Sequence, residues 1–249
     1  DRRRSALESD LSRQVRREQQ AVRARDELVS VVSHDLRNPM TIISMLCGMM
    51  QKTFSSDGSH ASRRITTAID TMQQASSRMN ILLEDLLDTS KIEAGRYTIS
   101  PQSLDVTQIF EEALSLLTPL ATDKGLELPF HSEPDLKIHA DPERLFQVLS
   151  NLISNAIKFT PAQGTIQVAA ITSGDDIVFS VRDSGKGIPA EQLPHIFERY
   201  WTAKEGNTSG TGLGLYISQG IIKAHGGLLV AQSTPGQGSK FRFTGPNFA

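Results

Sequence analysis

Apolar residues in the N-terminal third of the chain recur at helical intervals. Steps of four and three connect Leu11, Val15, Val22, Val29, Val32 and Leu36, with polar residues at positions 18 and 25. A heptad seam of this kind favours packing against another helix. A second periodic stretch runs through Ile65, Ile69, Met72, Met79, Leu83 and Leu86, after the turn-forming segment SSDGSH at 55–60. The pattern predicts a helical hairpin.

Two helices of this kind cannot bury both sides of their seam. Pairing with a second hairpin into a four-helix bundle would cover it, so we expect a homodimer. The alternative is a two-helix linker that packs against the C-terminal part of its own chain.

The chain beyond about residue 100 alternates between helix-like and strand-like stretches. Start and stop signals predict helices at 107–125, 142–160 and 212–227. Apolar alternation predicts strands at 165–171, 176–183, 227–233, 239–244, 97–100 and 136–138, the third and fourth joined in a hairpin by TPGQGS. We therefore expect an α+β chain, in which the helical hairpin precedes an α/β sandwich with helices on one face of a mixed sheet.

Composition adds a boundary and several exclusions. Only two of the 18 glycines lie in residues 1–94, so the break in character falls near residue 95. With 26 Lys and Arg against 28 Asp and Glu, the net charge of -2 gives no electrostatic support for binding nucleic acid or a membrane surface. The single cysteine, Cys47, excludes an intrachain disulfide and fits a cytoplasmic location.

The ends of the chain and its hydropathy give two further expectations. No apolar run reaches the length of about 18 residues that a membrane span needs, so we expect no span in this chain. Because the sequence begins at Asp1 and not at a methionine, we expect an upstream part of a longer protein to be missing.

The segment SVVSHDLRNPM carries a candidate nucleophile. The heptad count places His34 at position f, which faces solvent. An exposed imidazole next to a carboxylate can attack an electrophile, because Asp35 can accept the proton from its other ring nitrogen. Pro39 kinks the helix one turn later. Taken alone, the pair is also typical of an ordinary solvated helix face.

The segment NLISNAIKFT places two amides on one side of a helix. Asn151 and Asn155 are four residues apart, and Lys158 and Phe159 follow within one turn. Amide oxygens suit a magnesium ion that takes most of its ligands from phosphate and water, with Lys158 near the phosphates. The alternative is an amphipathic helix with its polar side in solvent.

Two glycine-rich segments complete the candidate chemistry. In VRDSGKGIP, Asp183 ends a predicted strand before Gly185 and Gly187, so its carboxylate can accept a hydrogen bond from an exocyclic amino group such as that of adenine. In TSGTGLGLYIS, Gly210, Gly212 and Gly214 open a helix whose first N–H groups attract anions. A tight turn and a solvent loop are the corresponding alternatives. Neither segment is a dinucleotide fingerprint or a P-loop.

The order of these motifs closely resembles that of the bacterial sensor histidine kinases over about residues 20 to 245. In that family SHDLRNP resembles the phosphoacceptor box, NLISNAIKF the N box, DSGKGIP the G1 box, IFERYW the F box and GTGLGL the G2 box. The resemblance implies a coiled-coil signalling linker at 1–26, a dimerisation and histidine phosphotransfer domain at 27–96, and a catalytic ATP-binding domain at 97–249.

The same resemblance implies a role for each matching residue. His34 takes the γ-phosphoryl group of ATP, Asp35 assists as base, Asn155 and Asn151 hold Mg2+, and Asp183 binds the adenine amino group. The nucleotide contacts are Asn151, Asn155, Lys158, Phe159, Asp183, Gly185, Gly187, Ile188, Phe197, Arg199, Gly210, Thr211, Gly212, Leu213, Gly214 and Leu215. The implied partners are a second copy of the chain, the receiver domain of a response regulator and an upstream sensor domain.

The phosphoacceptor box departs from the commonest family spelling, HELRTP. Asp35 and Asn38 replace the glutamate and threonine of that spelling and keep a carboxylate and a polar side chain. In the resemblance Asn38 would orient water against a phosphoaspartate, which also allows a phosphatase activity. Variants reading HDLRNP occur among phytochrome-type kinases, which suggests a photosensory parent.

Two other classes of protein remain as alternatives. The ATP-binding segment also resembles the gyrase, chaperone and mismatch-repair ATPases, which carry a water-activating glutamate where this chain has Asn151. Hydrolysis of ATP by water should therefore be poor. The third class is a scaffold that binds no nucleotide, against which the complete set of boxes argues.

Overall fold

The chain divides into two compact units, Asp1–Arg96 and Tyr97–Ala249. The computed structural model describes residues 40–41, 43–45, 47, 60–174, 176–202 and 211–246. The part of the first predicted helix before Met40, with His34, Asp35 and Asn38, lies outside these ranges, as do Gly210 and positions 55–59 of the predicted turn. Every helix within the described ranges is too short or too polar to cross a lipid bilayer.

The first unit contains one long helix, α2 (His60–Glu93), as the second apolar repeat predicts. The described residues between 40 and 47 are helical too. The hydroxyl of Ser76 on α2 donates to the carbonyl of Met40 at 3.2 Å and is hydrogen-bonded to the hydroxyl of Ser44. Met40, Cys47 and Ile69 are buried. The two helical segments therefore pack against each other.

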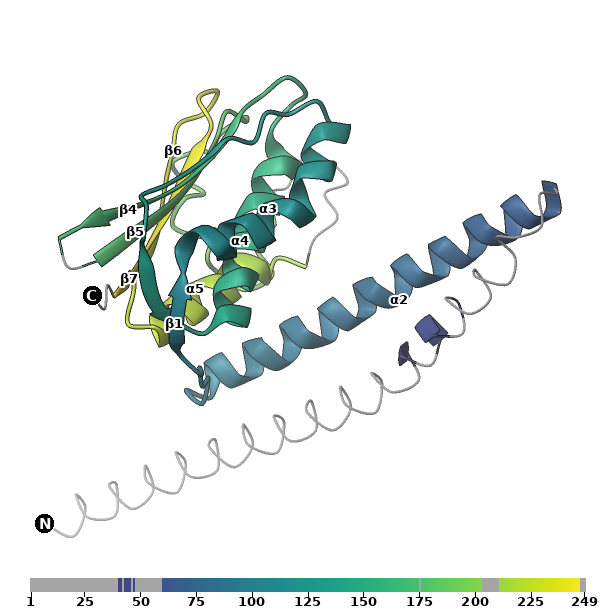
Figure 1. Cartoon of the computed structure of the whole chain (residues 1–249), viewed down its shortest axis with the longest axis horizontal. Helices are drawn as coiled ribbons and strands as arrows, with labels where there is room; N and C mark the ends of the chain where they lie inside the picture. The colour runs from purple at the N-terminus through teal and green to yellow at the C-terminus, as the bar shows by residue number, and fades with distance from the viewer. Residues whose placement is uncertain are drawn as a thin grey trace, which may run out of the picture. The chain divides into compact units, whose positions relative to one another are not determined.

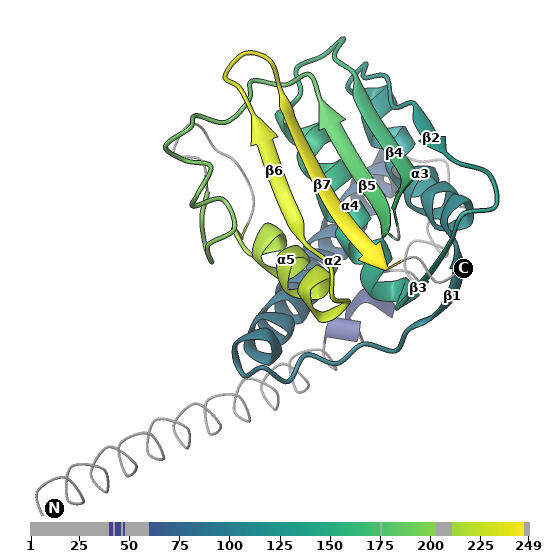
Figure 2. The same ribbon diagram turned by 90° about the vertical axis from the view of Figure 1, so that its left-hand side faces the viewer.

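The second unit is a mixed sheet with helices on one face (Figures 1 and 2). The sheet order is β2-β4-β5-β7-β6, with β2 parallel to β4 and the other neighbours antiparallel. Its strands are β2 (Phe130–Ser132), β4 (Ile166–Ser173), β5 (Asp176–Asp183), β6 (Leu229–Ser233) and β7 (Ser239–Pro246). The covering helices are α3 (Val106–Asp123), α4 (Pro142–Phe159) and α5 (Gly214–Ala224), and β1 (Gln102–Asp105) pairs with β3 (Lys137–Ala140) beside them. This confirms the predicted class.

The apolar pattern explains the layers. On β5 the buried positions alternate, with Ile177, Phe179 and Val181 facing the helices. The ring of Phe179 stacks on that of Phe243 with centroids 4.6 Å apart and meets Phe110 of α3 edge-on at 5.8 Å. These three fully buried rings join the sheet to its helical layer.

Helix α4 begins where its sequence signals place it. The Asp141 carboxylate accepts from the backbone N–H of Arg144, and Pro142 occupies the first turn, where its missing N–H costs nothing. The His225 ring links this start to the end of α5, because its Nε2 accepts from the Asp141 N–H at 3.0 Å and its Nδ1 lies 2.8 Å from the Ile221 carbonyl oxygen.

Two strand predictions are wrong. Residues 97–100 form no strand, and β1 instead begins after Pro101, since the Ser100 N–H is bound to the Asp141 carboxylate at 2.9 Å. Strand β2 is missing from the prediction because three residues, two of them exposed, produce no readable alternation.

The aromatic cluster yields a stability prediction. Phe179→Ala should lower the free energy of unfolding of the second unit by about 3 to 5 kcal/mol, because it leaves a large cavity between sheet and helices. Urea denaturation followed by circular dichroism measures the loss. Ile171→Ala, at a strand position that is 43% exposed, is the control and should cost well under half as much; equal losses would show that the cluster is not the centre of the core.

Candidate functional site

Two asparagines of α4 face the start of α5. The Asn155 amide nitrogen donates to Asn151 Oδ1 at 3.3 Å, and the Asn151 amide nitrogen donates to the Ser218 hydroxyl at 2.9 Å. A Cβ atom on Gly214 would lie 2.3 Å from Asn151 Oδ1, so the first turn of α5 can approach this closely only with glycine there. The hydrogen bonds run from α4 through Asn151 to α5 and fix the orientation of both amides.

This arrangement suits a metal ion that takes most of its ligands from phosphate oxygens and water. The Asn155 amide turns its nitrogen to Asn151, so its oxygen points the other way. Within the described residues, no group of three or more His, Cys, Asp or Glu side chains could hold a metal. Magnesium tolerates such a small protein contribution, because phosphate oxygens and water complete its octahedral shell. The amide oxygens therefore fit Mg2+ bound together with a nucleotide.

Asp183 lies on the inner face of the sheet. It continues the buried series of β5 and is itself 7% exposed. Burial raises the pKa of its carboxyl group, and hydrogen bonds from the backbone N–H groups of Gly185 and Ser239 oppose that rise. The Gly185 bond to Asp183 Oδ1 measures 2.8 Å. A carboxylate held this way keeps lone pairs for a ligand donor.

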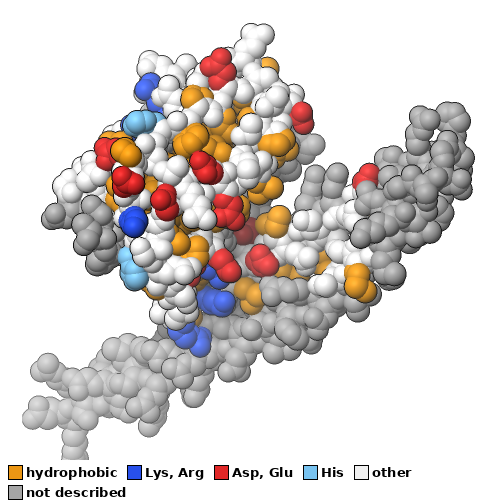
Figure 3. Space-filling model, viewed as in Figure 1, with side chains coloured by type: hydrophobic (Ala, Val, Ile, Leu, Met, Phe, Trp, Pro, Cys, Tyr) orange, Lys and Arg blue, Asp and Glu red, His pale blue; other side chains and the backbone are white. Residues whose placement is uncertain are grey.

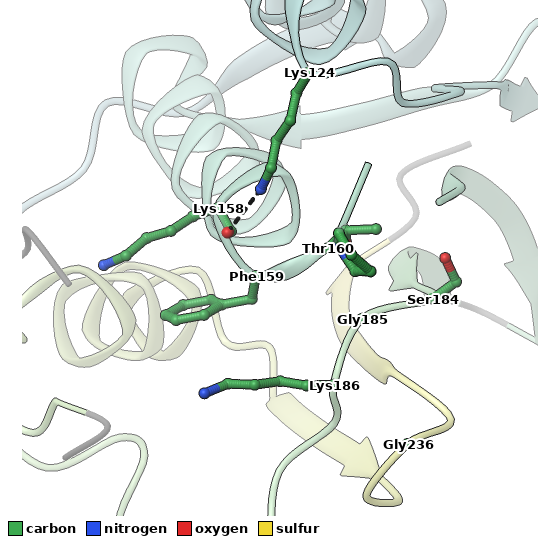
Figure 4. Close-up of a pocket in the computed structure, with 9 residues that line it drawn as sticks. Lys124, Lys158, Phe159, Thr160, Ser184, Gly185, Lys186 and Gly236 are labelled. Carbon is green, nitrogen blue, oxygen red and sulfur yellow. Dashed lines mark hydrogen bonds between the residues drawn. The ribbon is translucent and has the colours of Figure 1, made fainter. Parts of the chain in front are cut away.

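The end of α4 and the turn after Asp183 share a pocket of about 480 Å³ (Figure 4). Lys158 Nζ lies 4.9 Å from the Phe159 ring centroid and Lys186 Nζ lies 6.0 Å from it, and Figure 4 shows the two lysines on opposite sides of the ring. Burial lowers the pKa of Lys158. Two ammonium groups beside an aromatic ring suit a ligand with both phosphates and a base.

The pocket is anchored at its rim by Lys124. Its ammonium donates to the carbonyl oxygens of Ile157 at 2.6 Å and of Lys158 at 2.9 Å. Figure 4 shows the bond to Lys158. These carbonyls belong to the last turn of α4, where helical partners are missing, so the lysine both satisfies them and complements the helix dipole. Lys124 thereby fixes the end of the helix that carries Lys158 and Phe159.

The segment that contains Phe197 and Arg199 ends against the start of α5. Gly212 has a φ of +70°, and a Cβ there would lie 2.5 Å from the carbonyl carbon of Tyr200 and 2.7 Å from the carbonyl oxygen of Trp201. Phe197 is half-buried and Arg199 is exposed. The two ends of the polar segment between Trp201 and Gly212 are thus side by side.

The structure brings most of the described candidate residues together. The segment with Asn151 and Asn155 meets the one with Gly214, and a Cβ on Gly185 would lie 2.7 Å from the Phe159 carbonyl oxygen. Thr211 accepts from the Leu213 N–H at 3.2 Å, and Leu213 is buried ahead of Leu215 in the first turn.

Sequence reasoning missed four residues of the site: Lys124, Lys186, Ser218 and Gly236. Two of them carried a signal. Ser218 is four residues after Gly214, one helical turn along the face that meets Asn151, and Lys186 lies between Gly185 and Gly187. Lys124 and Gly236 reach the pocket through tertiary packing alone, which spacing does not reveal.

Two family descriptions match the chain. Residues 24–95 match the His Kinase A (phospho-acceptor) domain, and residues 140–247 match the histidine kinase-, DNA gyrase B- and HSP90-like ATPases. The second match contains all the described side chains of the asparagine and Asp183 sites.

Individual proteins show the same similarity. The chain is 35% identical to the sensor histidine kinase ZraS of Klebsiella oxytoca, over 90% of this chain and 48% of ZraS, and 36% identical to the non-motile and phage-resistance protein of Caulobacter vibrioides, over 91% and 27%. It therefore spans half or less of these relatives.

Solved structures agree. Full-length ShkA in complex with AMPPNP matches with a TM-score of 0.72 and 27% identity over 90% of this chain and 46% of ShkA. The catalytic domain of histidine kinase ThkA matches with a TM-score of 0.55 and 31% identity, over 60% of this chain and 97% of that domain. From the ordered motifs and these matches, the chain belongs to the bacterial sensor histidine kinase family.

Proposed function

We propose that the chain is the kinase part of a two-component signalling protein, which phosphorylates itself on His34 with ATP. One imidazole nitrogen of His34 attacks the γ-phosphorus, the bond to the β-phosphate oxygen breaks, and ADP leaves. Asp35 accepts the proton from the other ring nitrogen. The phosphoryl group then passes to an aspartate of a response-regulator receiver domain.

One observation supports this proposal above the others. Two segments that are distant in the sequence meet α4: Gly214 lies against Asn151, and Gly185, next to Asp183, lies against Phe159. Together they supply amide oxygens, an aromatic ring, ammonium groups and a buried carboxylate, which is the chemistry that a Mg-nucleotide requires.

Each residue of the site has a distinct role in the proposed complex. Asp183 accepts a hydrogen bond from the adenine amino group, Phe159 lies against the base, and Lys158 neutralises phosphate charge. In the proposed complex, backbone N–H groups at the start of α5, such as those of Gly214 and Leu215, face anionic oxygens, and Thr211, Gly212 and Leu213 shape the turn that precedes them. Phe197 and Arg199 act from the segment that precedes α5.

Asn155 would hold the magnesium ion, and Asn151 would orient the Asn155 side chain. When bound, Mg2+ neutralises charge on the transferred phosphates. Asn151 is already engaged with Ser218 and Asn155, so its contribution is to hold the Asn155 oxygen toward the ligand.

The proposed organisation follows the two units. Residues 1–26 form a coiled-coil signalling linker, 27–96 the dimerisation and phosphotransfer domain, and 97–249 the ATP-binding domain. The division after Arg96 and the phosphoacceptor match at 24–95 support this arrangement. We propose that the reaction takes place in the cytoplasm and that a sensor domain controls it from upstream. As a second role, Asn38 would support a phosphatase activity toward the phosphorylated regulator.

The proposed homodimer rests on α2. Met72, Met79 and Leu86 are exposed and seven residues apart, so they form one apolar stripe on the helix, where Figure 3 shows hydrophobic side chains at the surface. A matching stripe from a second copy would bury them as the core of a four-helix bundle.

Phosphorylation is the direct test of the proposed function. Incubation with γ-labelled ATP and Mg2+ should label the parent chain, and His34→Gln should remain at background. The label should be lost in acid and retained in alkali, as expected for phosphohistidine. His131→Gln, which changes an exposed histidine on β2, is the control and should label normally. A parent that binds ATP but takes no label would refute the kinase proposal.

The asparagine site yields a binding prediction. Asn155→Ala should weaken ATP binding about 10-fold in the presence of Mg2+ and change it little in excess EDTA, because only the metal-linked part of the affinity is lost. Isothermal titration calorimetry under both conditions measures the difference. Ser154→Ala, at the exposed neighbouring position of α4, should behave as the parent. Equal weakening with and without metal would rule out Asn155 as a ligand.

The apolar stripe on α2 predicts the effect of a charge. Met79→Glu should weaken self-association by about 100-fold or more, because each copy would bury an unpaired carboxylate. Analytical ultracentrifugation over a range of concentrations measures this. Ser77→Glu places the same charge at an exposed position of α2 outside the stripe and should leave association unchanged. A parent that sediments as a monomer would contradict the proposed dimer.

A further inference from the structure

The turn between β6 and β7 (234–238) packs directly on the turn that follows Asp183 (184–188). The Gly236 N–H donates to the Lys186 carbonyl oxygen at 2.8 Å. A Cβ on Gly187 would lie 2.1 Å from the Thr234 carbonyl oxygen, and one on Gly238 would lie 1.9 Å from that of Asp183. Both glycines have positive φ, of +70° and +81°. The two turns are therefore in contact at their backbones.

The hydroxyl of Ser233, at the end of β6, joins these turns. It accepts from the Ile188 N–H at 2.7 Å and donates to the Gly238 carbonyl oxygen at 2.8 Å. Its oxygen also lies 2.9 Å from the Ser239 hydroxyl oxygen. A hydroxyl has one proton to donate, so Ser239 must be the donor in this last bond. All three hydrogen-bonding capacities of the Ser233 hydroxyl are used.

The same strand ends also touch the Asp183 carboxylate. Ser239 pairs with Ser233 in the β6–β7 register, and its backbone N–H donates to the Asp183 carboxylate. The Gly185 N–H donates to that carboxylate from the other turn. Ser233 is therefore connected to Asp183 on two sides, through Ser239 and through the backbone at Ile188.

We propose that Ser233 is a positioning residue for recognition of the nucleobase, because it fixes the 184–188 turn and with it the direction of the Asp183 carboxylate. This inference rests on the proposed nucleotide site and adds a residue to it. Ser233 itself makes no contact with ligand. Ser233→Ala would leave the Ile188 N–H without its partner and the Gly238 carbonyl with only the longer bond from the Thr234 N–H, at 3.3 Å, and the turn would relax to satisfy the Ile188 N–H.

The test compares two ligands that differ only in the group that Asp183 binds. Purine riboside triphosphate lacks the exocyclic amino group of ATP, so the ratio of the two dissociation constants isolates the Asp183 contact. In the parent chain with Mg2+, ATP should bind about 10-fold or more tightly than the analogue. In Ser233→Ala this preference should fall to about 3-fold or less, while affinity for the analogue changes by less than about 2-fold.

Two further variants separate positioning from folding. Ser233→Thr keeps the hydroxyl in a strand that accepts a β-branched residue and should retain the parent preference. Ser180→Ala removes a half-buried serine from the middle of β5 and should retain it as well. Thermal melting of each variant reports stability independently of binding.

Three results would overturn the proposal. A full ATP preference in Ser233→Ala would show that the hydroxyl does not position Asp183, while leaving the nucleotide site intact. Equal weakening of both ligands would assign Ser233 a structural role only. A parent that binds both nucleotides equally would instead refute the role of Asp183 in the proposed function, and the inference would fall with it.

Discussion

The site depends on how closely α4 packs against its neighbours. This helix buries one face on the sheet, between α3 and α5, and its seven buried side chains fix its rotation. That rotation places the asparagines beside α5 and carries Phe159 to the turn after β5. Gly214 lies against the Asn151 side chain and Gly185 against the Phe159 backbone, so the absence of a Cβ at both positions permits these close approaches.

Much of the fold could be predicted because its elements are long and strongly patterned. Helices α3, α4 and α5 and strands β4 to β7 follow from apolar periodicity and from Gly and Pro signals. Strand β2 could not be predicted, because it pairs only through its parallel neighbour β4, and β1 was misplaced because its start depends on the distant Asp141. Pairing between remote segments has no local signature in one sequence.

The site residues that could be predicted are those with a local signal in the sequence. Asp183 was predicted because it ends a strand before Gly185 and Gly187, and the structure adds that it falls on the buried face of β5, where hydrogen bonds must compensate the cost of a carboxylate. Ser233 sends no such signal, because a serine at the end of a strand is ordinary. Its importance arises only when the β6–β7 turn folds back onto the turn after Asp183.

Residue 151 is an asparagine and not a glutamate, which affects whether bound ATP is hydrolysed by water or reacts with another nucleophile. Activating water for attack on ATP needs a base near the γ-phosphate, and an amide cannot accept a proton at neutral pH. Both ends of the Asn151 amide are hydrogen-bonded, the nitrogen to Ser218 and the oxygen to Asn155. The amide therefore helps to hold α4 and α5 together instead of acting as a base. A site that binds the nucleotide without activating water preserves the γ-phosphoryl group for another nucleophile. In the proposed function, His34 with Asp35 beside it in the sequence is that nucleophile, so the γ-phosphoryl group passes to the chain itself and is not lost to water.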